Sequence, residues 1–319
     1  MAKSEPRRLI KFGKSSFVLS LPKGWIQKNG LKGKDVLYVE EENNFLKIIP
    51  KERKNEVIEE KKVIDIEGKT YDEVNRRLIS AYINNYTEII LKGKNEIVRK
   101  NVNNLMDKIG IEIVEQNQNE IIIKDFLSME GIEIDKIIRR MDNMIRSLFD
   151  DVKTGLESKV FKESIYDEMI KVDKNINKIY FLIWKIVKKG QKMPYFFIEK
   201  LNMHPEDLAN IQWLTIQLES IADEIKRVAK FLVNEKLDKD KAEFSKVILL
   251  IENHYLDIMA AYYSKDVDLA LKVISKKDSI MKSCLNLAEK SSFYKFGAIC
   301  ERLKTLTGSI HHISKIVAY

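Results

Sequence analysis

From about residue 130 onward, apolar residues recur at steps of three and four, and residues that break helices are scarce. One such stripe runs from Leu218 to Leu232, on a single side of a helix. Four glycines follow Gly131, and no proline follows Pro205. The pattern predicts six long helices with antiparallel neighbours, in two sets of three that form an internal repeat (130–238 and 239–319). The predicted helices span residues 132–155, 160–189, 205–235, 241–263, 267–290 and 293–318.

The positive charge of the chain is concentrated at its N-terminus. Residues 1–34 hold nine Lys or Arg and one Glu, a net charge of 9 − 1 = +8, which equals the charge of all 319 residues. The remaining residues therefore balance to zero. This asymmetry predicts a polyanionic partner at the N-terminus, most simply duplex DNA.

The sequence predicts a cytoplasmic protein without membrane insertion. The N-terminus lacks the apolar run of a signal peptide, and no stretch approaches the roughly 20 apolar residues of a membrane span. Cys284 and Cys300 lie in apolar helical patterns, which predicts thiols and not a disulfide framework.

Residues 7–50 predict a small β-rich module. Strands are expected at 7–12 and 16–21, a short helix from Pro22 to Lys28 that stops at Asn29-Gly30, and a hairpin of strands at 33–39 and 45–50. This order resembles the AbrB/SpoVT swapped-hairpin DNA-binding module. About 45 residues bury too little surface to be stable alone. In that family two chains interleave their hairpins into one β-barrel, so the resemblance implies a homodimer (module at 1–54).

Two interpretations are open for the basic residues of this module. They could form an ordinary solvated surface, or they could contact DNA. The concentration of charge favours DNA, with Arg able to reach guanine edges and Lys phosphates. The residues predicted to make the contacts are Arg7, Arg8, Lys11, Lys14 and Lys23.

Residues 55–128 alternate strand and helix patterns after a charged linker, which predicts a small α/β domain of order βαβαββ. Strands are expected at 63–66, 88–91, 112–114 and 120–123, with helices at 71–84 and 96–109. Gly68-Lys69-Thr70 is no phosphate-binding loop, because the first glycine of that motif would fall at Val63, inside a strand. A spacer or dimerisation role is predicted for this domain.

Two pairs of polar residues lie at the borders of apolar stripes in the first helical repeat. Asp173 and Asn177 are four residues apart, as are Glu219 and Asp223, so each pair points one way. The acid pair, followed by Ile225 and then Val228-Ala229, resembles the third-helix signature of PhoU, a phosphate-signalling helical bundle family. The resemblance covers residues 130–319 (domain at 129–319).

The PhoU resemblance implies that these four residues hold a divalent or iron cation, since hard and borderline cations take oxygen ligands. The other interpretation is that they are solvated faces of charged helices, and it is favoured. The second repeat departs from the family: Thr307 and His311 stand where the acid pair stands. His311-His312, at the end of the last helix, could ligate a metal or place favourable charge at a helix C-terminus, and the second interpretation is favoured.

The whole chain is thus predicted to be an α+β multidomain protein: a swapped-hairpin module, a small α/β domain and a PhoU-like six-helix bundle. The predicted function is a DNA-binding transcriptional regulator of phosphate uptake. The alternative is an adaptor that docks on a phosphate ABC transporter or a signalling protein without binding DNA. No nucleophile elbow, catalytic triad or glycine-rich nucleotide loop occurs, and the prediction is that the protein is not an enzyme.

Overall fold

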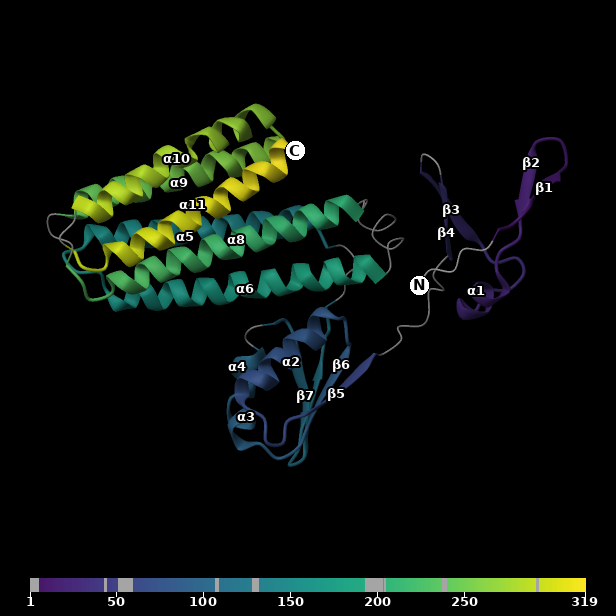
Figure 1. The fold of residues 1–319 in the computed structure, drawn as a ribbon. Helices are drawn as coiled ribbons and strands as arrows, with labels where there is room; N and C mark the ends of the chain where they lie inside the picture. Colours follow the sequence, from purple (N-terminus) through teal and green to yellow (C-terminus); the bar gives the residue numbers. More distant parts are fainter. Residues whose placement is uncertain are drawn as a thin grey trace. The chain divides into compact units, whose positions relative to one another are not determined.

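The computed structural model describes residues 6–42, 45–50, 60–106, 109–127, 132–192, 203, 205–236, 240–290 and 293–319. It confirms a mixed α and β architecture with a small strand module, a small sheet and a bundle of long helices (Figure 1). The chain forms two compact units, Met1–Ile58 and Glu59–Tyr319, so the sheet and the bundle share the second unit. The predicted domain boundaries at 54/55, 128/129 and 238/239 lie outside the described residues.

The N-terminal module (residues 7–50) has its elements in the predicted order. They are β1 (Leu9–Phe12), β2 (Ser16–Leu19), α1 (Lys23–Lys28), β3 (Leu37–Glu42) and β4 (Phe45–Pro50). In the described residues β1 pairs antiparallel with β2, and β3 with β4, as two separate two-stranded sheets. In the described residues these two sheets do not join into the predicted barrel.

Turns fix the ends of the elements in this module. Pro22 precedes α1 in extended backbone, and Gly30 follows it with a φ of 60°, as the helix-ending signal predicts. The strand expected from residue 33 begins later, at Leu37. The reason is a turn in which Lys34 has a φ of 80° and the Lys32 amide donates to the Asp35 carboxylate at 2.7 Å.

Apolar side chains lie on both faces of the β1–β2 hairpin. Cross-strand partners share a face, so Leu9 and Leu19 lie on one face while Ile10 and Val18 lie on the other. The sequence predicts half-buried strands here, whereas both strands are exposed throughout in one chain. The exposed fraction reaches 70% at Phe12. The reason is that no described residue covers either face.

The four-stranded sheet confirms the predicted α/β pattern. Across it the order is β5-β6-β8-β7, with β5 and β6 parallel and the other neighbours antiparallel. Its core, which includes Leu78, Ile89 and Ile121, lies on the face toward α2. The elements are β5 (Lys61–Asp65), α2 (Tyr71–Ile83), β6 (Glu88–Lys92), α3 (Glu96–Lys100), α4 (Val102–Met106), β7 (Glu112–Gln116) and β8 (Glu120–Lys124).

Polar side chains set the helix ends in this part. Thr70 and Glu73 form a capping box that begins α2, with the Thr70 amide donating to the Glu73 carboxylate at 2.9 Å. The single helix predicted over 96–109 is instead two short helices. Asn101 ends the first of them, because its side-chain amide donates to the Ile97 carbonyl at 2.8 Å and competes with the helical hydrogen bonds.

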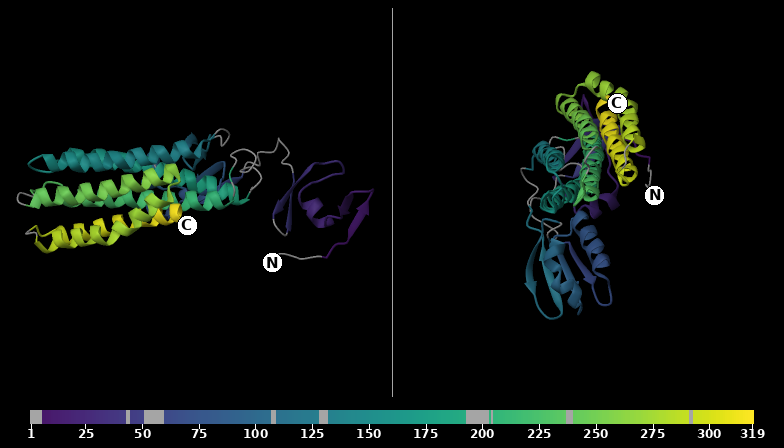
Figure 2. Two further views of the ribbon diagram at one scale, coloured as in Figure 1. Left: turned by 90° about the horizontal axis from the view of Figure 1, so that it is seen from above. Right: turned by 90° about the vertical axis from the view of Figure 1, so that its left-hand side faces the viewer.

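Long helices form the bundle as predicted, six of them over the described residues. Across the two sets of three, the third helices pack on each other (α8 on α11), as do the first helices (α5 on α9). The second helices, α6 and α10, pack within their own sets (Figure 2). The elements are α5 (Ile134–Glu157), α6 (Glu163–Lys192), α8 (Pro205–Leu232), α9 (Lys241–Ser264), α10 (Val267–Lys290) and α11 (Phe296–Ala318).

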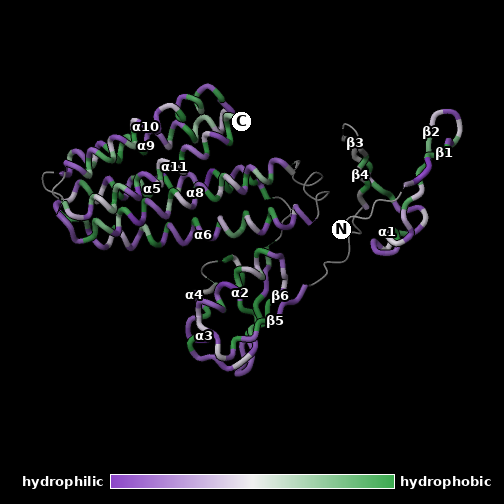
Figure 3. The backbone as a smooth tube through the Cα atoms, in the orientation of Figure 1, coloured by the Kyte–Doolittle hydropathy of each residue, from purple (hydrophilic) through white to green (hydrophobic). Residues whose placement is uncertain are grey.

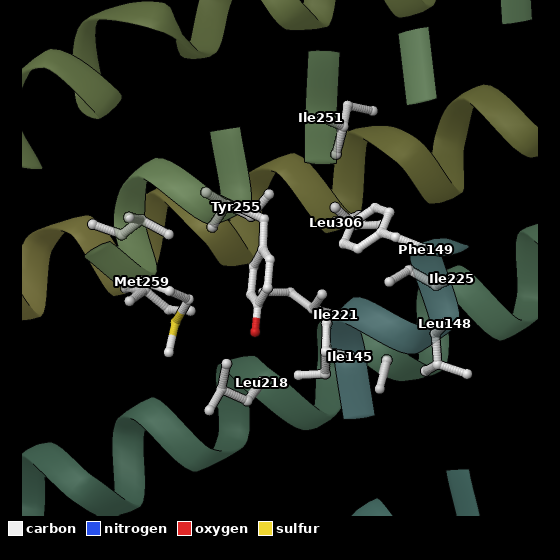
Figure 4. Close-up of a cluster of buried hydrophobic side chains, with 14 of the residues drawn as sticks. Ile145, Leu148, Phe149, Leu218, Ile221, Ile225, Ile251, Tyr255, Met259 and Leu306 are labelled. Atoms are coloured by element: carbon white, nitrogen blue, oxygen red, sulfur yellow. The ribbon is translucent and has the colours of Figure 1, made fainter. Parts of the chain in front are cut away.

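The stripe predicted from Leu218 onward is core. Leu218, Ile221 and Ile225 are buried in the space between the helices, near Phe149 and Tyr255, whose ring centroids are 5.8 Å apart (Figure 4). Apolar residues recur between polar ones along every bundle helix (Figure 3). The bundle is therefore held by apolar burial, as the helical periodicity predicts.

The α/β part is attached to the bundle through α2 and α6. The side-chain amide of Asn85 donates to the backbone carbonyl of Lys185 at 3.1 Å. The Lys185 ammonium pairs with Asp125, just after β8, and lies 4.4 Å from the ring centroid of Tyr82. Both charged side chains are buried, so this contact includes an ion pair that is shielded from water.

Candidate nucleic-acid interface and acidic cluster

The residues predicted to contact DNA are spread along the β1–β2 hairpin, and all five are exposed. Arg7 and Arg8 lie just before β1, at the open end of the hairpin, and Lys11 lies within β1. Lys14 lies in the turn that joins β1 to β2, at the other end of the hairpin. Lys23 is the first residue of α1. One chain therefore does not gather these residues at a single point.

Most of these basic side chains carry charge that no residue described by the structure neutralises. Arg8, Lys11, Lys14 and Lys23 form no ion pair with any residue that the structure describes. Their charge is thus available to a partner. Phosphate groups of a nucleic acid would release their counterions on meeting such side chains, and this release drives binding.

The acidic residues of the first repeat come together around a lysine. Lys226 on α8 places its ammonium 2.7 Å from an Asp173 oxygen on α6 and 2.8 Å from an Asp223 oxygen. Arg227 pairs with the other oxygen of Asp223. Glu219, one turn before Asp223, is half-buried, and no described residue forms an ion pair with it. The cluster thus contains three carboxylates and two basic side chains.

The arrangement of this cluster does not fit a bound cation. Lys226 already occupies the position between two carboxylates where a metal ion would have to lie. The Asn177 amide nitrogen donates to the backbone carbonyl of Asp173 at 3.0 Å and to its carboxylate at 3.3 Å. Among the described residues, no three His, Cys, Asp or Glu side chains form a metal-binding group. Cation binding at the four predicted residues stays a prediction.

Replacing Glu219 with glutamine is expected to raise the free energy of unfolding at neutral pH by about 0.5 kcal/mol, the scale of partly exposed charge interactions. Burial, and then the charges of Asp223 and Asp173, raise the pKa of Glu219. The folded chain then holds this proton more tightly than the unfolded chain, so the carboxylate costs stability above its unfolded pKa. The gain should therefore shrink as the pH falls towards about 4.

Denaturant unfolding of both proteins from pH 4 to 7, in the presence of a chelator, measures this effect. The matched control is Glu243→Gln, at an exposed position of α9. Stabilisation of the unmodified chain by Mg²⁺ or Mn²⁺, lost in Glu219→Gln, would instead show that the cluster binds a cation.

Residues 10–56 match the family model described as antidote-toxin recognition MazE, bacterial antitoxin. The N-terminal module is similar to MazE. The chain therefore carries a MazE- and AbrB-like domain at its N-terminus, as the order of its elements predicts. No curated protein and no solved structure matches the chain. The resemblance of residues 130–319 to PhoU stays a prediction.

The MazE-like module contains the hairpin with two exposed apolar faces and the unpaired basic side chains. No buried residue occurs in it among those whose burial the structure describes. For the rest of the chain, no described helix combines the length and the apolar character that a bilayer crossing requires.

Sequence reasoning missed Lys226 and Arg227 as partners of the acidic residues. Opposite charges three and four residues apart on one helix form pairs, so the spacing from Asp223 was a usable signal. The contact of Lys226 with Asp173 is a tertiary contact between α8 and α6, and no local pattern predicts it.

Proposed function

We propose that this chain is a DNA-binding regulator in which two copies of the MazE-like module build one DNA-binding surface. The match over residues 10–56 carries the proposal. The exposed, unpaired basic side chains of Arg8, Lys11 and Lys14 support it, because they supply charge to the hairpin that a second chain would complete.

Apolar exposure supports the dimer. Leu9 is 64% exposed and Phe17 is 59% exposed, on the same face of the hairpin, and Ile10 is 59% exposed on the other. Large apolar side chains on both faces of a two-stranded sheet are unfavourable in water, since each buried Å² contributes about 25 cal/mol. Interleaving with a second module would bury both faces.

The second unit would supply the input to this regulator. We propose phosphate status as that input, with components of a phosphate ABC transporter as partners. The support is the resemblance of residues 130–319 to PhoU, together with the two sets of three helices that pack through their first and third members. Genomic fragments selected by the full chain should then include promoters of phosphate-transport genes. If the chain selected other promoters, the phosphate input would be wrong, but the proposal that the chain binds DNA would stand.

The full chain is expected to bind labelled duplex DNA in fluorescence anisotropy, with an affinity that falls steeply between about 50 and 200 mM salt. Arg7→Ala and Arg8→Ala should weaken binding most, because they flank β1 and could reach both phosphates and guanine edges. Each lost phosphate contact should flatten the log–log salt dependence by about one unit.

Exposed lysines of α10 provide the control: Lys272→Ala and Lys282→Ala remove the same charge from the second unit and should leave binding unchanged. Equal losses in the control and N-terminal variants would refute DNA binding by the MazE-like module. No binding by the unmodified chain would favour the adaptor without DNA binding. The family description favours one further candidate, an antitoxin, which relief of growth arrest by a toxin from a neighbouring gene would identify.

A further inference from the structure

The sheet of the second unit has one covered face and one open face. Helix α2 lies on the covered face, and no described element of this unit packs on the other (Figure 2). On the open face Val63, Ile90 and Ile122 are paired across β5, β6 and β8, so they form one apolar row. None of the three belongs to the core of the sheet, and Val63 is 56% exposed.

Charged residues flank this apolar row on both sides. Residues two positions away along a strand point to the same face, so each strand presents a charge, a β-branched residue and the opposite charge. The three sets are Lys61, Val63 and Asp65 in β5, Glu88, Ile90 and Lys92 in β6, and Lys124, Ile122 and Glu120 in β8.

The two charged rows differ in how they are paired. In the first row, the Glu88 carboxylate forms ion pairs with the ammonium groups of Lys61, at 3.0 Å, and Lys124, at 3.3 Å. These contacts, with that of Lys61 the largest, lower the pKa of Glu88. In the second row, Asp65, Lys92 and Glu120 form no ion pair with any described residue. Lys92 lies across from Asp65 and Glu120, but within one chain no ion pair forms among the three, so each can still pair with a charge from outside.

We propose that this open face binds the same face of a second copy of the chain, about a twofold axis that runs along the apolar row. Such an axis places each strand antiparallel to its own copy. Lys61 then meets Asp65 of the second copy, Glu88 meets Lys92, and Lys124 meets Glu120. Each residue of the apolar row meets its own counterpart. Every charge of the second row gains an opposite charge, and the apolar row is covered.

The other twofold arrangement, with the axis along the strands, is less favourable. It places β5 over β7 of the second copy. The β-bulge in β7 puts Glu115 opposite Ile122, in the position that continues the apolar row. Val63 would then face the exposed Glu115 carboxylate, and Glu115 would face Val63, so the apolar row would not be covered at its end. In the first arrangement Val63 is covered by an apolar side chain. Glu115 then meets its own counterpart on the edge strand β7, where water and salt screen the two carboxylates. The first arrangement is therefore the one proposed, and it does not depend on DNA binding.

A cysteine placed on the axis tests this contact. Stacked sheets lie about 10 Å apart, so Val63→Cys should join two full chains through a bismaleimide of that reach. Burial raises the pKa of Cys284 to about 12 and also raises that of Cys300, so the native thiols should react slowly. The control is Ile97→Cys on α3, which is 65% exposed and lies outside the open face.

At about 10 μM protein, Val63→Cys should cross-link about a hundredfold faster than Ile97→Cys, since a bound pair has a millimolar effective concentration. Adding Lys92→Glu should remove this advantage, because the new carboxylate meets Glu88 of the second copy. Lys272→Glu, on exposed α10, should not. Equal rates for the two cysteine variants, or no effect of Lys92→Glu on a chain with unchanged circular dichroism, would overturn the proposal.

Discussion

Replacing Asp125 with alanine is expected to lower the free energy of unfolding of the second unit by about 3–5 kcal/mol, the usual cost of leaving one buried ion-pair member alone. Asp125 and Lys185 have 6% and 4% of their side chains exposed. Lys185 would keep its contact with the Tyr82 ring but lose its counter-charge. Denaturant unfolding followed by circular dichroism measures the loss.

The same variant should become more stable as the pH rises. Burial, and then the positive charge of Lys189, lower the pKa of Lys185, and removing the Asp125 carboxylate takes away a charge that opposes them. In the unfolded chain the lysine pKa is about 10.4, so over a window that ends near pH 10 the folded variant binds fewer protons. Its free energy of unfolding should therefore increase over this window.

Two variants make this prediction specific. Lys192 on α6 also contacts the sheet part, donating to the Asn84 carbonyl at 3.3 Å, but it is half exposed, so Lys192→Ala should cost less than about 1 kcal/mol. The double variant Lys185→Met/Asp125→Leu should recover much of the loss, because it leaves no unpaired buried charge. A loss in Lys192→Ala equal to that in Asp125→Ala would show that burial of the pair is not the cause.

Asp142 is the second position where a large effect is expected, about 3–5 kcal/mol on replacement with alanine. Its carboxylate, on α5, is 2% exposed and accepts two hydrogen bonds from Arg146, at 2.9 and 3.0 Å. It also accepts hydrogen bonds from the hydroxyl groups of Tyr255, at 2.8 Å, and Tyr263, at 3.0 Å, both on α9. The carboxylate therefore joins the first helices of the two repeats, and its loss leaves the buried Tyr255 hydroxyl and the partly buried Arg146 and Tyr263 donors without this acceptor.

Unfolding experiments on single variants separate the parts of this network. Tyr255→Phe should cost about 1.5–3 kcal/mol, because it removes one hydrogen bond to a charged group. Asp150→Ala, on the same helix but 68% exposed, should cost less than about 1 kcal/mol. If Asp142→Ala lowered the free energy of unfolding no more than Asp150→Ala, the hydrogen bonds of Asp142 would contribute little to the stability of the contact between α5 and α9.

The secondary structure was largely predictable because its causes are local. The helix predicted at 241–263 is observed at Lys241–Ser264, and the one predicted at 267–290 is observed with those bounds. Both follow from apolar periodicity over neighbouring residues. Where prediction was wrong, as for the helix over 96–109, an asparagine side chain competed with the backbone, an effect that periodicity does not include.

The candidate sites were predictable only in part. Charge asymmetry pointed to the basic residues of the N-terminal module, but under the proposed function their arrangement would depend on a second chain, which one sequence does not position. The buried charges were not predictable. Asp142 resembles any other helical acid in the sequence, yet its partner Tyr255 is 113 residues away. Lys226 likewise reaches Asp173 across 53 residues, so only the packing of the helices reveals either contact.

The β1–β2 hairpin, with its two apolar faces, affects how DNA binding would depend on the cellular concentration of this protein. Under the proposed function, a competent DNA-binding surface forms only when two chains meet. At abundances below the dissociation constant, mass action makes the number of such surfaces follow the square of the chain concentration, so halving expression removes about three quarters of them. Promoter occupancy would then respond to synthesis and dilution of the protein as a threshold, before any signal reaches the helical bundle.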